Sequence, residues 1–121
     1  MTVDSFSVAG VNDHITPWDV VYRSTLLLGG KRRFILSNSG HIQSILNPPG
    51  NPKATYSENA TLSNDPRAWY YDATHIKGSW WPQWLSWLQE RSGELRDTVM
   101  ASGNTRYPPR EAAPGTYVHV R

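Results

Sequence analysis

The sequence predicts an α/β fold built around parallel strands, on the basis of three successive patterns. Residues 3–9 alternate between apolar and polar side chains, residues 18–28 carry a helical apolar stripe, and residues 34–36 are a continuous apolar run. A strand, a helix and a second strand within about 35 residues form a βαβ unit, in which the strands are parallel and the crossover is almost always right-handed. We therefore expect both strands to end at the same edge of one sheet.

The first strand and the helix have recognisable ends. The alternation stops at Gly10, which ends the strand. In the helix, Thr16 is expected to cap the start, Pro17 suits the first turn, and Asp19 lies where the helix dipole favours a negative charge. Glycines at 29–30 supply the stop. The buried stripe of this helix is predicted to consist of Trp18, Val21, Tyr22, Thr25 and Leu28.

The second half of the chain is expected to contain a loop, two helices and a tail. Residues 47–52 are rich in proline and cannot form a regular helix or a central strand. Residues 65–73 and 80–91 are each predicted to form a helix, the second capped by Ser79. From Gly103 onward, proline and glycine mark an extended tail.

Tryptophan is the unusual feature of the composition, with six in the chain and four of them between Trp80 and Trp87. On the predicted helix, Trp80, Trp84 and Trp87 share one face, and Leu85 and Leu88 lie beside them. We expect this nearly all-apolar helix to be buried against the sheet. The alternative is an exposed aromatic platform for an apolar polymer or a sugar.

The predicted elements divide the chain into three parts of one incomplete domain. Residues 1–46 form the βαβ unit, in which Asp13 and His41 follow the two strands. Residues 47–102 form the proline-rich loop and the tryptophan-rich helices, and residues 103–121 form the extended tail. Two parallel strands alone expose their hydrogen-bonding edges and are normally covered on both faces. The chain therefore has the character of a piece of a larger sheet.

Length, charge and composition exclude several classes of function. A chain of 121 residues is one small domain or part of a larger one, and its net charge of +2 is too small to indicate a nucleic-acid surface. Because the sequence has no Cys, it holds no disulfide, thiolate metal site or cysteine nucleophile. No segment approaches the roughly 20 apolar residues that span a bilayer, and the start lacks a signal peptide, so a cytoplasmic protein is expected.

Asp13 and His41, which follow the two predicted strands, are the strongest candidates for catalytic residues. A carboxylate that orients an imidazole, which in turn takes a proton from a nucleophile, is the shared logic of catalytic triads. Gly10 and Gly40 precede them and would let the backbone turn sharply into the site. The alternative for each residue considered separately is a structural role: Asp13 would stabilise a turn or cap a helix, and His41 would be a polar residue with its hydrogen bonds made.

His14 directly follows the candidate acid. Because neighbouring residues at a strand end point to opposite sides, we assign His14 a supporting role, as a hydrogen-bonding residue of the loop. One aspartate and two histidines also suggest a metal. A third ligand at helical or turn spacing is missing, so no metal site is expected.

Four stretches of the chain carry a family resemblance: residues 8–18 (VAGVNDHITPW), 37–52 (SNSGHIQSILNPPGNP), 78–82 (GSWWP) and 112–119 (AAPGTYVH). Together they closely resemble the C-terminal region of polyhydroxyalkanoate synthases, and the resemblance covers essentially the whole chain. Residues 37–47 are similar to the class II enzymes, which act on medium-chain substrates.

The resemblance implies an α/β-hydrolase core, a Cys, Asp, His triad and no cofactor. The family transfers (R)-3-hydroxyacyl groups from coenzyme A thioesters to a growing polyester held on the Cys. By motif position, His41 resembles the base that generates the thiolate. Asp13 resembles the catalytic acid, which either orients His41 or helps to activate the 3-hydroxyl of the incoming unit.

The resemblance also implies the partners and the location of the whole enzyme. Its substrates are 3-hydroxyacyl-CoA and the polyester chain, and it works in the cytoplasm at the surface of polyester granules. A homodimer of the full enzyme is compatible with the resemblance, whereas a nucleic-acid partner and a membrane span are not expected.

The chain departs from the family because the Cys nucleophile and the strands around it are missing. We therefore expect a C-terminal fragment of a synthase that is inactive by itself. One alternative is a fragment of another α/β-hydrolase, such as a thioesterase or polyester depolymerase, which the upstream nucleophile motif would identify. Another is a stand-alone aromatic module, which would fold in isolation and retain a polymer.

Overall fold

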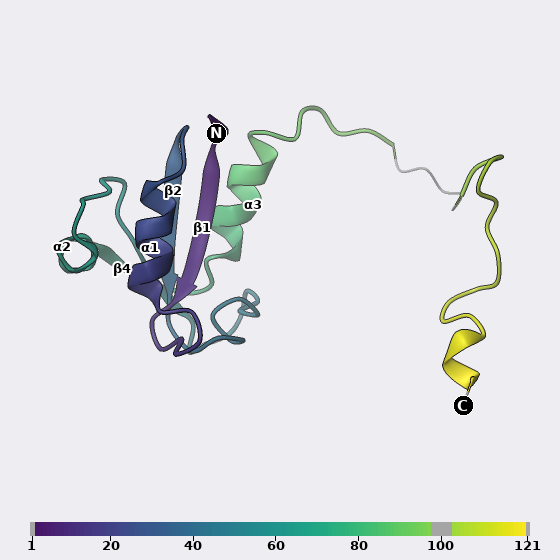
Figure 1. Cartoon of the computed structure of the whole chain (residues 1–121), viewed down its shortest axis with the longest axis horizontal. Helices are drawn as coiled ribbons and strands as arrows, with labels where there is room; N and C mark the ends of the chain where they lie inside the picture. Colours follow the sequence, from purple (N-terminus) through teal and green to yellow (C-terminus); the bar gives the residue numbers. More distant parts are fainter. Residues whose placement is uncertain (1, 98–102, 121) are drawn as a thin grey trace.

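A mixed β-sheet is the centre of the molecule. The computed structural model describes residues 2–97 and 103–120, and in these residues four strands form one sheet in the order β1-β2-β3-β4. β1 and β2 lie side by side in Figure 1. β1 and β2 are parallel, whereas β3 and β4 run antiparallel to their neighbours. The strands are β1 (Ser5–Gly10), β2 (Arg32–Ser37), β3 (Thr55–Glu58) and β4 (Thr74–Lys77).

The predicted βαβ unit is present. Helix α1 (Trp18–Leu26) connects β1 to β2, and the parallel register pairs Val8 with Ile35 and Gly10 with Ser37. The two strands therefore end side by side, as the sequence predicted. The apolar run of β2 is buried on both faces, because Phe34 and Leu36 contribute to one core cluster and Ile35 to the other.

The predicted ends of α1 are partly wrong. Pro17, not Thr16, precedes the first turn, and no side chain caps it. The Thr16 hydroxyl instead donates a hydrogen bond of 2.6 Å to Asp13 Oδ2. The helix ends at Leu26, and Leu28 is exposed rather than part of the buried stripe.

Strands β3 and β4 were not predicted, so the expectation of an isolated parallel pair is wrong. They are short and largely polar, with sequences TYSE and THIK, and they lie in the stretch that was expected to hold a loop and helices. Between them, α2 (Pro66–Tyr71) begins as predicted. Its cap is the Asp65 side chain, which accepts a 3.0 Å hydrogen bond from the Arg67 N–H.

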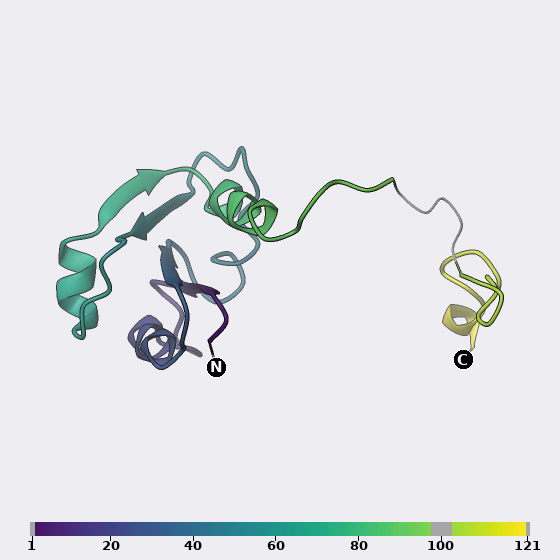
Figure 2. The same cartoon turned by 90° about the horizontal axis from the view of Figure 1, so that it is seen from above.

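Helices α1 and α3 (Trp81–Gln89) lie on opposite faces of the sheet (Figure 2). On the α1 face, the buried rings of Tyr22, Phe34 and Trp69 pack edge to face or tilted, with centroids 5.0 to 5.3 Å apart. On the other face, Ile35, Tyr56 and Trp80 form a second buried cluster. The two clusters thus form separate apolar layers on the two faces of the sheet.

The prediction that the tryptophan-rich helix is buried is wrong for this chain. None of the residues of α3 is buried, and Trp84 and Leu85 are 42% and 54% exposed. The buried indole is that of Trp80, which immediately precedes the helix. Ser79 is not the capping residue, although its Oγ accepts a 3.0 Å hydrogen bond from the Trp81 N–H. The helix contacts the sheet through one side only and leaves an apolar side open.

The C-terminal segment is not wholly extended. Residues 103–120 contain a short 3₁₀ helix, η1 (Tyr117–His119), and a turn in which the Asn104 N–H donates to the Tyr107 carbonyl. The segment was predicted to start at Gly103, directly after residues 98–102, which lie outside the described residues, as do Met1 and Arg121. Among the residues that are described, no helix is long and apolar enough to cross a bilayer.

Candidate active site

Two loops meet at the edge of the sheet where β1 and β2 end. The Val11 N–H donates to the Ser37 carbonyl at 2.9 Å, and the Asn12 N–H donates to the Ser39 carbonyl at 3.1 Å. These bonds continue the pairing of the parallel strands past their last residues. They hold the loop that carries Asp13 against the loop that carries His41.

Asp13 is a buried carboxylate whose two oxygens both accept hydrogen bonds. Oδ1 accepts from the backbone N–H groups of Ile15 and Thr16, at 2.9 and 3.0 Å. Oδ2 accepts from the Thr16 hydroxyl at 2.6 Å and lies 2.8 Å from Nδ1 of His41. The side chain is only 5% exposed, so its orientation is set by these four partners.

These hydrogen bonds hold the pKa of Asp13 well below its ordinary value. The largest cause is the bond from the Thr16 hydroxyl, followed by the bond from the Thr16 N–H. Burial acts in the opposite direction, and the bonds from His41 and Ile15 lower the pKa further. Asp13 is therefore a fixed negative charge near neutral pH.

We expect Thr16→Val to raise the pKa of Asp13, because it removes the hydrogen bond that lowers this pKa most. In the native protein, the charged carboxylate contributes stability above the unfolded-state pKa of about 3.9, and that contribution is lost as the pH falls towards the lower native pKa. The variant should therefore be less stable than the native protein at neutral pH, and its stability should fall less as the pH is lowered. Carboxyl NMR titration measures the pKa, and Thr16→Ser, which keeps the hydroxyl, is the control. An unchanged Asp13 pKa in Thr16→Val would contradict this assignment.

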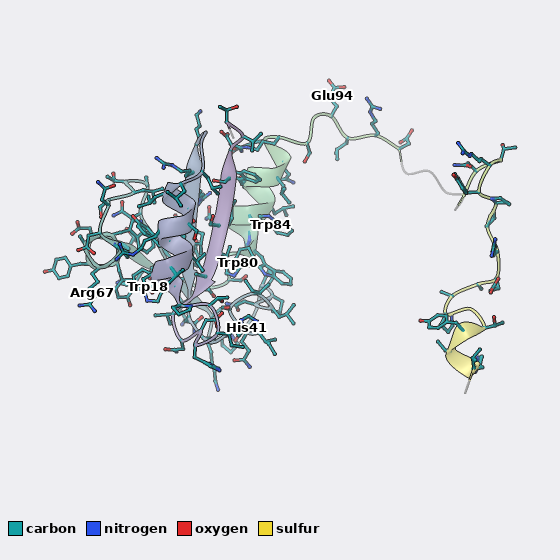
Figure 3. The ribbon with its side chains drawn as sticks, viewed as in Figure 1. Trp18, His41, Arg67, Trp80, Trp84 and Glu94 are labelled. Atoms are coloured by element: carbon teal, nitrogen blue, oxygen red, sulfur yellow. The ribbon has the colours of Figure 1, made fainter. Side chains whose placement is uncertain are left out.

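His41 is held by Asp13 at one nitrogen and open at the other. Because an ionised carboxylate only accepts hydrogen bonds, Nδ1 carries the proton that is shared with Asp13. Nε2 is then the nitrogen that can take a proton, and the side chain is 48% exposed at the end of the sheet (Figure 3). The pair can accept a proton at Nε2 while the carboxylate stabilises the imidazolium that forms.

Gly10 and Gly40 were expected to let the backbone turn sharply into the site, and the structure shows different roles. Neither Gly10 nor Gly40 has a left-handed backbone; the residue with positive φ is Ser39, at 84°. Gly10 is required for close approach instead, because a Cβ there would lie 2.8 Å from Cβ and Oγ of Ser44. The turn into the His41 loop thus depends on Ser39, and Gly10 makes room for the residues that follow His41.

His14 is exposed and lines the same shallow, open hollow as His41. The other lining residues are Ile15, Gly40, Ile42 and Gln43. The supporting role assigned to His14 stays a prediction. Within the part of the chain that the structure describes, no group of three or more His, Cys, Asp or Glu side chains is arranged to hold a metal ion.

Sequence reasoning missed Thr16 as a partner of Asp13. The signal was present in the spacing, because an aspartate often accepts hydrogen bonds from backbone groups two and three residues further along the chain. It was overlooked because a threonine directly before a proline is also typical of a helix start.

A buried aspartate that binds Nδ1 of a histidine is the arrangement by which enzymes of the acyl-transfer class activate a nucleophile. No model of a known protein family matches the chain. Curated proteins do, however, match it over almost its whole length.

The chain is 66% identical over 119 residues to poly(3-hydroxyalkanoate) polymerase 2 of Ectopseudomonas oleovorans, and 58% identical over 118 residues to polymerase 1 of the same organism. It is 40% identical over 119 residues to the polymerase subunit PhaC of Cupriavidus necator. Each match covers 98% of this chain but only 20 to 21% of the relative.

The chain is therefore homologous to a segment of the polyhydroxyalkanoate synthase family, which confirms the resemblance in its sequence. It spans about a fifth of the length of these relatives, and the matched part is their C-terminal region.

Proposed function

We propose that this chain supplies the acid and the base of a poly(3-hydroxyalkanoate) synthase whose nucleophile lies outside it. The observation that carries the proposal is the 2.8 Å contact between Asp13 and His41, in a segment 66% identical to a polymerase. The names of the relatives favour a polymerase over the thioesterase or depolymerase alternative. In this proposal the parent enzyme transfers (R)-3-hydroxyacyl groups from coenzyme A to a polyester.

The proposed chemistry uses His41 twice. Nε2 takes the proton from the thiol of a cysteine in the upstream part of the enzyme, and the thiolate attacks the thioester carbonyl of the substrate. The C–S bond to coenzyme A breaks, the departing thiolate takes the proton from His41, and the acyl group stays on the cysteine as a new thioester. In the transfer step, His41 takes the proton of a 3-hydroxyl group as its oxygen attacks an acyl thioester and forms an ester bond. The C–S bond to the cysteine breaks, and the departing cysteine thiolate takes the proton back from His41.

Of the two roles open to Asp13, the geometry favours the orientation of His41. The carboxylate is nearly inaccessible, and its oxygens accept four hydrogen bonds from within the chain. A substrate hydroxyl would have to displace one of these partners to bind Asp13 directly. We therefore propose that the substrate hydroxyl is activated by His41 and that Asp13 stabilises the imidazolium.

We further propose that the parent enzyme has an α/β-hydrolase core. The parallel β1–β2 pair, with candidate residues at its carboxyl edge, supports this fold. β1 is the outermost strand of the sheet, so a strand from the upstream part could pair with its free edge. In this view the three parts predicted from the sequence belong to one domain that the upstream part completes.

Substrate class and location are also proposals. Residues 37–47 resemble the class II enzymes, which supports medium-chain 3-hydroxyacyl-CoA as the substrate. The polyester chain and the cytoplasmic granule surface follow from the same resemblance, and a homodimer of the parent enzyme is compatible with it.

A chimera tests the proposed function. The 119 matched residues of the Ectopseudomonas oleovorans polymerase 2 are replaced by the corresponding residues of this chain, and coenzyme A release from medium-chain and short-chain (R)-3-hydroxyacyl-CoA is measured. We expect polymerase activity with preference for the medium-chain substrate. A soluble chimera that releases coenzyme A without forming polyester would favour the hydrolase alternative, and one without any turnover would contradict the proposal.

The isolated chain is expected to release no coenzyme A from these substrates, because it contains no Cys to form the acyl thioester. The His41→Ala variant of the chain provides the background rate. Release by the chain above that background would mean that it contains a nucleophile of its own, and the proposal would fail.

A further inference from the structure

The backbone that carries His41 has no regular secondary structure. We call residues 41–47 the His41 segment; it consists of turns closed by hydrogen bonds such as Ser44 N–H to the Gly40 carbonyl, at 3.0 Å, and Leu46 N–H to the Ile42 carbonyl, at 2.9 Å. These bonds join the segment to itself and to the residue before it. They do not fix it against the second face of the sheet.

Three consecutive side chains bind this segment: those of the two residues before α3 and that of its first residue. The Trp80 indole N–H donates to the Ser44 carbonyl at 2.8 Å, and the Trp81 indole N–H donates to the Ile45 carbonyl at 2.9 Å. The Ser79 hydroxyl donates to the carbonyl of Asn47. Each bond joins groups more than 30 residues apart in sequence, and each ends on a backbone carbonyl of the His41 segment.

Trp80 is itself rigidly held. It is 6% exposed, belongs to the buried cluster with Ile35 and Tyr56, and packs against Phe6 with ring centroids 6.2 Å apart. Its indole N–H therefore presents a donor whose position is set by β1, β2 and β3. Trp81 is more exposed, so water can more easily replace its bond.

The bound residue Ser44 connects the segment to the Asp13 side of the site. It is 1% exposed and packs against Gly10, at the end of β1 and three residues before Asp13. Its own hydroxyl donates to the His41 carbonyl at 3.4 Å. A shift of Ser44 would therefore move the His41 backbone relative to the carboxylate that orients its ring.

We infer that Ser79, Trp80 and Trp81 are positioning residues that hold the His41 segment so that His41 meets Asp13, with Trp80 as the principal anchor. This inference rests on the proposed function for its catalytic consequence, but the geometry of His41 can be measured without any turnover. None of these three side chains contacts a reacting group in this role. They act through the carbonyls of Ser44, Ile45 and Asn47.

Trp80→Phe is the direct test, because it keeps an aromatic ring and removes the donor to Ser44; the loss of ring volume that comes with it is reproduced in the control. Trp69→Phe is the matched control: Trp69 is also buried, and its indole N–H also donates to a loop carbonyl, that of Asn59, at 3.3 Å. Trp69 belongs to the buried cluster on the α1 face, and its indole bond ends on Asn59, outside the His41 segment. Ser79→Ala removes the bond to Asn47, together with the bond that the Ser79 hydroxyl accepts from the Trp81 N–H, and leaves the side chains of the buried aromatic cluster unchanged.

The first readout is the ring proton on Nδ1 of His41, observed by NMR in the ¹⁵N-histidine-labelled chain and assigned by its loss in His41→Gln. We expect the hydrogen-bonded proton signal to shift or broaden in Trp80→Phe and in Ser79→Ala, and to be unchanged in Trp69→Phe. An unchanged signal in both segment variants would overturn the inference, whatever the activity of the chimera. If Trp80→Phe does not fold, the signal of the Nδ1 proton in Ser79→Ala decides whether the inference holds.

The second readout is the kinetics of the chimera. We expect Trp80→Phe to lower kcat roughly 10- to 100-fold, the scale of a small misplacement of a catalytic group, with KM unchanged within about twofold. Trp69→Phe should leave kcat at the level of the parent chimera at a temperature where both are folded. Equal losses of kcat in the two variants would mean that Trp80 acts through stability alone, and the inference would fail. An inactive parent chimera would count against the proposed function, and the NMR result would still decide the positioning role.

Discussion

His41→Gln in the chimera is expected to lower the rate of coenzyme A release by several orders of magnitude, on the order of the 10⁴-fold loss seen when a triad acid is neutralised. The amide side chain of Gln can still fill the space but cannot take a proton at the position of Nε2. Because His41 is half-exposed and has one side-chain hydrogen bond, to Asp13, the fold should change little.

Asp13→Asn should cause a comparable loss for a different reason. The amide keeps the size of the carboxylate but loses its charge, so the imidazolium of His41 is no longer stabilised. His75→Gln is the control, since His75 bonds to Ser57 on β3 rather than to the candidate acid. If either site variant keeps more than about a tenth of the parent turnover, that residue is not part of the catalytic pair.

Trp69→Ala is expected to lower the free energy of unfolding of this chain by about 3 to 5 kcal/mol. The indole is completely buried between Tyr22 and Phe34, and its N–H donates to the Asn59 carbonyl. A loss of this size is a large part of the total stability of a small domain, about 5 to 15 kcal/mol.

Trp84→Ala provides the contrast, with an expected loss near 1 kcal/mol or less, because this side chain is 42% exposed on the open side of α3. Chemical denaturation followed by circular dichroism measures both values. Equal losses for the two variants would mean that the open side of α3 is packed in solution, as the sequence pattern suggested.

The βαβ unit could be predicted because its signals are local and repeat over whole elements. Alternation in β1, the stripe of α1 and the apolar run of β2 each indicate one type of structure. Parallel pairing then brings the ends of β1 and β2 together, so the sequence alone places Asp13 and His41 at one edge of the sheet.

β3 and β4 could not be predicted, since each has four residues and few apolar positions. Their pairing depends on contacts between residues far apart in sequence, such as Tyr56 with Ile76. The exposure of α3 could not be predicted from the sequence for a related reason. Periodicity identifies an apolar helix face but carries no information about what covers it, and here the chain leaves Trp84 and Leu85 open.

The finer parts of the candidate site also depend on tertiary contacts. The four hydrogen bonds of Asp13 follow partly from local spacing, through Ile15 and Thr16. The contacts of Trp80 and Trp81 with the His41 segment join residues 36 positions apart, and the motif that contains them suggested only a helix start. A single sequence cannot reveal such a contact unless the fold between the two partners is known.

The rate at which iodoacetamide alkylates the nucleophilic cysteine of the chimera, measured between pH 5 and 9, tests most directly whether His41 is the base of the enzyme. We predict rapid alkylation near neutral pH that depends on His41, so that His41→Gln lowers the rate and shifts the profile towards the pKa of an ordinary thiol, about 8.5. Asp13→Asn should have a similar effect. Alkylation at the same rate and with the same pH profile in the parent chimera and in His41→Gln would contradict the assignment of the catalytic base to this chain.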